Sequence, residues 1–224
     1  KSVEQIFWLT YKKVVELGAK LFLPSWEKSN RTHGYLSGQV DPRDCFDAER
    51  MLKQALDIAP IAPNVMVKVP GTREGYQVIE ELTARGIATN KTLSFTVPQF
   101  VACMEAVQRG LVTARKDKVD LSRWRSVITH MSARFGALGD LKAQADSRAI
   151  HLSEAAARWA ELLIFKRAYR MLQERKHPSK MLMCSMRISP PMSDGSLASW
   201  HIEKIAGSDV VYACPPGYIE GLMQ

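Results

Sequence analysis

Short apolar runs rich in β-branched residues alternate along the chain with longer segments in which apolar residues recur about every 3.6 positions. The short runs predict strands and the longer segments predict helices. The expected strands cover residues 35–41, 64–69, 88–95, 126–132, 181–186 and 209–213. The expected helices cover residues 2–17, 44–59, 74–85, 97–109, 153–174, 197–206 and 216–223. Gly86 and Gly110 are expected to end two of these helices, and Ser153 is expected to cap the start of another.

This alternation predicts an α/β fold made of βαβ units around a parallel sheet. An open doubly wound sheet and a (β/α)8 TIM barrel both fit it. No glycine-rich phosphate-binding motif follows an expected strand, and polar residues gather at strand ends, so the barrel is favoured. A closed barrel needs eight strands and only six are expected, so we expect a single barrel domain over residues 1–224 that lacks its first two strands. The sheet edges left open would allow pairing with another copy of the chain, and a homo-oligomer is possible.

One expected strand, NVMVKV at residues 64–69, carries a lysine inside an apolar run. Alternate side chains of a strand point to opposite faces, so Lys68 shares a face with Asn64 and Met66, and the valines occupy the other. We expect the valines to pack against helices and Lys68 to point into the barrel. Loss of hydration would lower the pKa of its amine from about 10.4 and make it a nucleophile toward carbonyl carbons. The alternative is a lysine that reaches solvent or pairs with an acid.

The same alternation groups polar residues on the neighbouring strands. The groups are Ser37, Gln39 and Asp41; Asn90, Thr92 and Ser94; Thr129 and Met131; and Ser185 and Arg187. Their hydroxyl and amide groups suit the hydroxyls of a sugar, and Arg134 and Arg187 suit a phosphate, which a guanidinium can bind with two parallel hydrogen bonds. His130 is offset by one residue and is expected to point outward.

Composition limits the other classes of function. The net charge of +8 favours anionic partners, but the basic segment at residues 115–125 is interrupted by acids and contains one aromatic residue. We therefore expect a solvated loop there and no nucleic-acid site. Four widely spaced cysteines without a metal-binding or redox motif predict free thiols in a reducing cytoplasm. No apolar run approaches the roughly 18 residues of a membrane span.

Four segments resemble the transaldolase family in their order and spacing. They are HGYLSGQVDPR (33–43), PNVMVKVPGTREG (63–75), RGIATNKTLSFTVPQF (85–100) and IAGSDVVYACP (205–215). The resemblance runs from about residue 33 to the end of the chain, and its lysine strand and asparagine–threonine strand are specific motifs. It implies a class I aldolase barrel without a metal or an organic cofactor. It also implies an enzyme of the pentose phosphate pathway that transfers a dihydroxyacetone unit between phosphorylated sugars through a lysine Schiff base.

The resemblance also assigns roles to individual residues. Lys68 matches the Schiff-base lysine, and Asn90 and Thr92 match the polar pair on the next strand. The implied catalytic residues are Lys68, Thr92 and Gln39, and the implied substrate-binding residues are Asn90, Thr129, Ser185, Arg134 and Arg187. Of the latter, the two arginines correspond to the family's phosphate ligands.

Proton transfer is where the chain departs from the family. Transaldolases carry a glutamate where this chain has Gln39, whose amide can orient a water but cannot exchange a proton at neutral pH. The related fructose-6-phosphate aldolases also have glutamine there, together with a tyrosine at the position of Met131. Three interpretations follow: a transaldolase, an aldolase-like lyase, and a non-catalytic homologue that binds phosphosugars.

Overall fold

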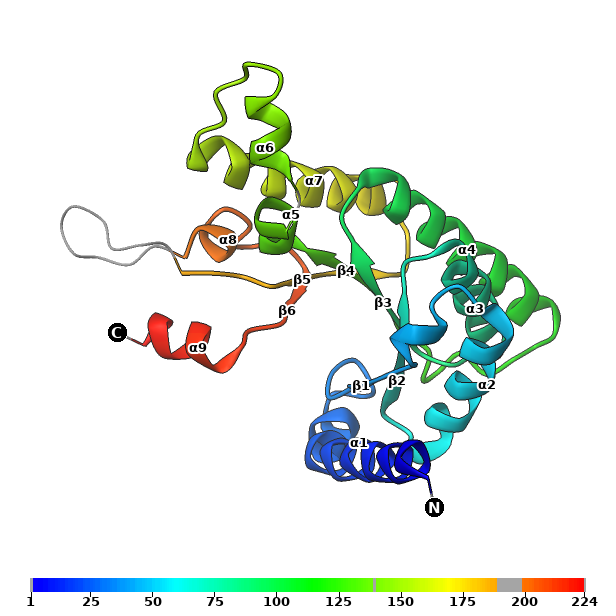
Figure 1. Ribbon diagram of the computed structural model, residues 1–224. Helices are drawn as coiled ribbons and strands as arrows, with labels where there is room; N and C mark the ends of the chain where they lie inside the picture. The colour runs from blue at the N-terminus through cyan, green and yellow to red at the C-terminus, as the bar shows by residue number, and fades with distance from the viewer. Residues whose placement is uncertain (1, 139, 189–198, 224) are drawn as a thin grey trace. The chain divides into compact units, whose positions relative to one another are not determined.

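Strands and helices alternate along the chain in the computed structural model, which describes residues 2–138, 140–188 and 199–223 (Figure 1). The strands are β1 (Leu36–Gln39), β2 (Val65–Pro70), β3 (Thr89–Ser94), β4 (Ser126–Met131), β5 (Lys180–Cys184) and β6 (Val210–Tyr212). The α-helices are α1 (Val3–Lys28), α2 (Ala48–Ile58), α3 (Arg73–Ala84), α4 (Val97–Lys116), α5 (Ser132–Leu138), α6 (Leu141–Asp146), α7 (Glu154–Glu174), α8 (Trp200–Glu203) and α9 (Pro216–Leu222). Two short 3₁₀ helices, η1 (Pro42–Asp44) and η2 (Ala59–Ile61), flank α2.

The strands follow one another in the sheet in the order of the chain, from β1 to β6. β1 is parallel to β2, β2 is parallel to β3, and β5 is parallel to β6. This topology confirms the predicted α/β class, and the described residues supply six of the eight strands of a closed (β/α)8 barrel.

Contacts divide the chain into two compact units, and each is described by itself. Unit 1 comprises Lys1–Thr92 and Ala102–Val127, and unit 2 comprises Leu93–Val101 and Ile128–Gln224. Whether the whole chain acts as the single expected domain stays a prediction.

The core of unit 1 lies between the strands and the helices that follow them. The valines of β2 are buried, as are the inward residues Val78, Ile79 and Leu82 of α3. In Figure 1, α2 and α3 lie on the same side of β2. In unit 2 the apolar residues of α7 and β5 form the corresponding layer, with Leu162 and Met181 fully buried.

All six predicted strands are present, but several helix boundaries differ from the prediction. α1 continues to Lys28, because its buried face continues through Val15, Ala19 and Trp26. α5 and α6 were not predicted, since helices of seven and six residues are too short to show a clear period. The last predicted pair of helices is present as α8 and α9, of which α8 has only four residues.

Three residues were predicted to lie at helix ends, and two of them do. Ser153 caps α7 by accepting a hydrogen bond from the Ala156 N–H at 3.2 Å, and Gly86 follows α3 with a φ of +71°. Gly110 does not end a helix, so that prediction is wrong. A Cβ at Gly110 would lie 2.5 Å from the Glu80 carbonyl oxygen, so this glycine allows α4 to approach α3 closely.

No helix in the described part of the chain is both long and apolar enough to cross a membrane.

Candidate active site

The carboxyl ends of β1, β2 and β3 bring three of the predicted site residues to one level of unit 1. In the strand register, Gln39 lies beside Lys68, and Lys68 lies beside Asn90. Thr92 lies one step further along, beside Pro70. Side chains at paired positions of parallel strands point to the same face, so the three residues at the level of Lys68 share a face of the sheet.

A hydrogen bond across β2 identifies that face. The Asn90 Nδ2 donates to Ser37 Oγ at 3.0 Å, although their strands are separated by β2. Lys68 therefore lies on the face of Ser37 and Asn90, as the alternation predicted. Its side chain is partly buried, and none of the carboxylates described lies within ion-pair distance of its amine. Asn90 and Thr92 are both buried.

Lys91 marks the opposite face of β3. Its side chain is 1% exposed, and its Nζ lies 5.6 Å from the centre of the Tyr76 ring in α3. Burial lowers the pKa of Lys91 to about 8, against the influence of Cys103, whose own pKa is raised by burial to about 12. Lys68 and Lys91, on adjacent strands, thus point to opposite faces of the sheet, and Lys68 points away from the helices.

The loop after β2 is held by two hydrogen bonds of the Thr72 hydroxyl. Thr72 caps α3 by accepting from the Gly75 N–H at 3.0 Å, and its hydroxyl donates to the Cys45 carbonyl at 2.6 Å. A Cβ at Gly75 would lie 1.9 Å from the Pro70 carbonyl oxygen, so only glycine fits there. These contacts hold the end of β2, and with it the backbone that follows Lys68.

Gln39 meets a residue that the sequence analysis did not single out. Its backbone N–H donates to the Tyr11 hydroxyl of α1 at 2.5 Å. Burial raises the pKa of that hydroxyl, and the bond from Gln39 opposes the shift. Both side chains line a cavity of about 850 Å³ whose other walls include Phe7, Trp8 and Val40. No local pattern connects a helix residue with a strand residue 28 positions later, so this contact could not be predicted.

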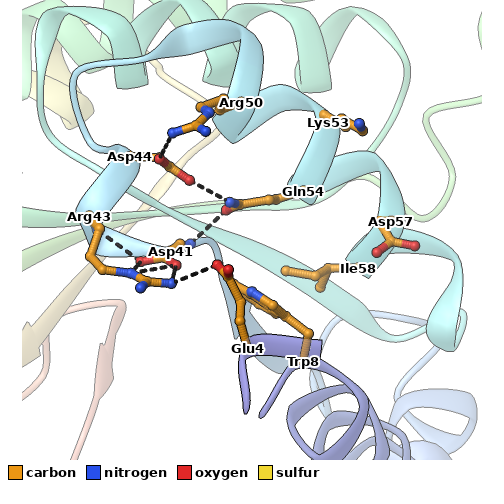
Figure 2. A pocket seen from close by; sticks show the side chains of 10 residues that line it. All are labelled: Glu4, Trp8, Asp41, Arg43, Asp44, Arg50, Lys53, Gln54, Asp57 and Ile58. Atoms are coloured by element: carbon orange, nitrogen blue, oxygen red, sulfur yellow. Dashed lines mark hydrogen bonds and ion pairs between the residues drawn. The ribbon is translucent and has the colours of Figure 1, made fainter. Parts of the chain in front are cut away.

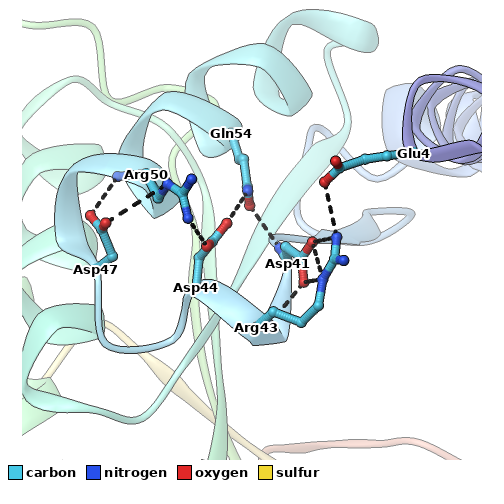
Figure 3. Close-up of polar contacts among 7 residues, drawn as sticks. All are labelled: Glu4, Asp41, Arg43, Asp44, Asp47, Arg50 and Gln54. Atoms are coloured by element: carbon cyan, nitrogen blue, oxygen red, sulfur yellow. Dashed lines mark hydrogen bonds and ion pairs between the residues drawn. The ribbon is translucent and has the colours of Figure 1, made fainter. Parts of the chain in front are cut away.

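Asp41, grouped with Gln39 in the predicted polar stripe, has a structural role (Figure 3). Arg43 donates to both oxygens of its carboxylate, from Nε at 3.0 Å and from Nη2 at 2.5 Å. This pairing lowers the pKa of Asp41. Gln54 accepts from the Asp41 N–H at 2.7 Å and donates to Asp44 at 2.7 Å. The network thereby ties the end of β1 to η1 and α2.

A second cavity, of about 760 Å³, lies beside this network (Figure 2). Its walls carry charges of both signs, and most of them pair within unit 1. Arg43 also pairs with Glu4 at 3.1 Å, and Arg50 pairs with Asp44 at 3.0 Å. Most of the charged groups around the cavity are therefore already engaged with one another.

In unit 2, the residues of β4 follow the predicted alternation. Thr129 and Met131 are buried, and the Met131 sulfur lies 3.0 Å from the Cys184 sulfur of β5. His130 points the other way, since its ring lies 5.7 Å from that of Phe100 in α4 and 6.1 Å from that of Phe165 in α7. The prediction that His130 points outward is confirmed. Its imidazole therefore does not share the face of the sheet on which Thr129 lies.

The two predicted phosphate ligands occupy adjacent parts of unit 2. Arg134 is exposed near the start of α5. Arg187 follows β5, and its Nη2 donates to the carbonyl of Ala133 at 3.3 Å, the residue directly before Arg134. The structure therefore brings the Arg187 side chain to the first turn of the helix that carries Arg134.

Left-handed backbone marks the ends of two strands. Leu93, after Thr92, and Ser185, before Arg187, both have a φ of +59°. This conformation costs a residue with a side chain about 1–3 kcal/mol, and such residues cluster at functional sites. Ser185 is partly buried, 3.7 Å from the Cys184 sulfur.

Across the described ranges, no cluster of three or more histidine, cysteine, aspartate or glutamate side chains has the geometry to hold a metal ion.

Comparison with known proteins identifies relatives of the chain. It matches transaldolases from Mycobacterium bovis (strain BCG / Pasteur 1173P2), with 33% identity over 122 residues, and from Thiobacillus denitrificans (strain ATCC 25259 / T1), with 37% identity over 116 residues. These matches cover 54% and 51% of this chain, and 33% and 32% of the respective relatives. The chain therefore aligns with about a third of the length of these relatives.

A family model described as transaldolase/fructose-6-phosphate aldolase matches residues 2–224, and so extends further toward the N-terminus than the resemblance seen in the sequence. Because this match spans nearly every residue, the chain belongs to the transaldolase/fructose-6-phosphate aldolase family.

Proposed function

We propose that this chain carries the Schiff-base site of a transaldolase acting on phosphorylated ketoses. The observation that carries the proposal is the position of Lys68, partly buried, in register with Asn90 and on the face away from Tyr76 and the helices. Family membership and relatives named transaldolase support the class of reaction.

In the proposed reaction, the neutral amine of Lys68 attacks the ketone carbon and forms a carbinolamine. Protonation of its hydroxyl releases water and leaves a protonated imine. As the C4 hydroxyl loses its proton, the bond between C3 and C4 breaks and its electron pair moves into the imine, which becomes an enamine. An aldehyde phosphate is released. A second aldehyde then accepts the dihydroxyacetone unit by the reverse steps, and hydrolysis of the imine regenerates the amine.

The neighbouring polar residues are assigned supporting roles. Asn90, held by Ser37, would hydrogen-bond hydroxyls of the bound sugar. Thr92 and Gln39 would orient the water that carries protons, since neither side chain titrates near neutral pH. Thr129 and Ser185 would contact further sugar hydroxyls.

Arg134 and Arg187 are proposed to bind the phosphate of the sugar. Guanidinium groups suit this role because their planar donors match the spacing of phosphate oxygens. The contact between Arg187 and Ala133 supports a joint role, because it brings the two arginines to the same helix turn. No metal or organic cofactor takes part in the proposed chemistry. The four free thiols fit a reducing compartment, and the cytoplasm is our proposal for its location.

The amide at Gln39 favours a second candidate, an aldolase-like lyase that releases dihydroxyacetone. Both candidates share the imine on Lys68 and differ in the fate of the enamine. Incubation with fructose 6-phosphate, with and without erythrose 4-phosphate, separates them. A transaldolase needs the acceptor for turnover, whereas a lyase releases free dihydroxyacetone in its absence.

The proposal is tested by borohydride reduction in the presence of fructose 6-phosphate, followed by mass spectrometry of the peptide that contains residues 64–72. We expect a reduced adduct on Lys68 and none on Lys91. A folded chain that gives no adduct on Lys68 would refute the proposed function.

A further inference from the structure

A buried acid lies beside the predicted phosphate ligand in unit 2. The Glu161 side chain of α7 is 1% exposed, and its Oε1 lies 3.6 Å from the Arg187 Nη2. Its other oxygen, Oε2, lies 2.9 Å from the Nε2 of His201 in α8, whose side chain is fully buried. One carboxylate therefore connects α7, α8 and the segment after β5.

An aromatic contact joins the two helices that carry the acid and its histidine. The rings of Trp159 in α7 and Trp200 in α8 meet edge to face, with centroids 4.8 Å apart. Each tryptophan is close in sequence to one member of the acid–imidazole pair. The bond from His201 restrains the carboxylate while its other oxygen faces Arg187, so little side-chain freedom remains to be lost.

The contacts of Arg187 leave part of its guanidinium available. Its interactions with Glu161 and with the Ala133 carbonyl both use Nη2. Within the part of the chain that the structure describes, Nε and Nη1 have no partner, and the side chain is 46% exposed. A guanidinium held at one nitrogen and open at the other two is prepared to bind an anion.

We propose that Glu161 is a positioning residue that holds Arg187 in the orientation required to bind the phosphate of the sugar. The inference rests on the proposed function. It makes Glu161, supported by His201, responsible for the preference for phosphorylated over unphosphorylated ketoses. Glu161 does not touch the sugar in this account. Its effect is confined to the phosphate and passes through the arginine.

The test measures the rate of borohydride-trapped adduct on Lys68 as a function of ketose concentration, for fructose 6-phosphate and for fructose. In Glu161→Gln, the concentration of fructose 6-phosphate giving half-maximal trapping should rise about tenfold, the order expected when one partner of a partly buried ion pair loses its charge. The value for fructose and the maximal rate should stay unchanged. Glu174→Gln is the matched control, because it makes the same change at an exposed position of α7.

A double-variant cycle shows whether the effect passes through the arginine. Arg187→Met should weaken phosphate-dependent trapping at least as much as Glu161→Gln, and the combined variant should be no weaker than Arg187→Met alone. If Glu161→Gln does not fold, Glu161→Asp provides the same comparison with a carboxylate withdrawn from the guanidinium.

The outcomes separate the two proposals. Absence of any Lys68 adduct in the parent chain contradicts the proposed function. A normal adduct combined with equal losses for fructose and its phosphate, or with additive effects in the cycle, overturns the positioning role and leaves the Schiff-base function intact.

Discussion

Two lysines on adjacent strands of unit 1 occupy opposite environments. Lys68 lies on the face of Asn90 and Ser37, partly buried and without an ion pair among the described residues. Lys91 lies on the other face, sealed between β3 and the Tyr76 ring, with its pKa lowered to about 8. A depressed pKa alone would select Lys91 as the nucleophile. Access to a substrate selects Lys68, and we give access the greater weight because a side chain that is 1% exposed cannot meet a sugar.

Replacing each of the two lysines by methionine, one at a time, should test this comparison with the largest effect. Lys68→Met is expected to lower turnover of fructose 6-phosphate by about 1,000-fold or more, the order of loss when a covalent nucleophile is removed. The measurement is the steady-state rate of aldehyde phosphate release. Lys91→Met serves as the control and should retain turnover. Comparable losses in both variants would mean that the face of the sheet does not decide which lysine reacts.

Lys91→Met should instead change stability. The pKa of Lys91 in the folded chain, about 8, lies below its ordinary value of 10.5, so the unfolded chain binds more protons between these pH values. Stability of the parent therefore rises with pH across this window, and the full cost of the buried charge is present below pH 8. Removing the charge should raise the free energy of unfolding at pH 7 by up to about 3 kcal/mol.

Urea unfolding at pH 7 and at pH 10.5 measures this effect. The advantage of the methionine variant over the parent should shrink toward zero at the higher pH, where the amine is neutral in the folded chain and only half protonated in the unfolded chain. A difference that is the same at both pH values would assign the effect to packing rather than to charge.

Asn90→Ala tests whether the face of the sheet that carries Lys68 also binds the sugar. The variant removes an amide in register with the lysine, and we expect kcat/KM to fall by about 10- to 100-fold, as for loss of a hydrogen bond to a polar substrate group. Trapping of the Lys68 adduct at saturating ketose should persist. Loss of the adduct itself would indicate that Asn90 supports the amine and not the sugar.

Ser37→Ala should have the smallest effect. Its hydroxyl accepts the bond that orients Asn90, and one such bond contributes about 1 kcal/mol. We therefore expect kcat/KM to fall by less than about tenfold, with an unchanged rate in the combined Ser37→Ala, Asn90→Ala variant relative to Asn90→Ala. Additive losses in a rate assay would show that Ser37 acts independently of the asparagine.

Alternation along single strands predicted which face Lys68, Asn90 and His130 occupy, because the direction of a side chain follows from local geometry. Contacts between distant segments were not accessible in this way. Tyr11 on Gln39, and Glu161 between Arg187 and His201, depend on how helices pack on strands. Asp41 is a further example: alternation placed it in the polar stripe, but could not predict that its carboxylate pairs with Arg43. Gly110 failed as a helix stop because close packing, rather than chain reversal, requires it.

β1 is the terminal strand of the sheet, and its outward N–H at Gln39 is occupied by the Tyr11 hydroxyl. A strand arriving from another copy would have to displace the phenol before its own carbonyl could reach that nitrogen. Among the described strands, this phenol thus occupies a backbone donor that an added strand would otherwise use, much as charge, proline or a bulge blocks other sheet edges.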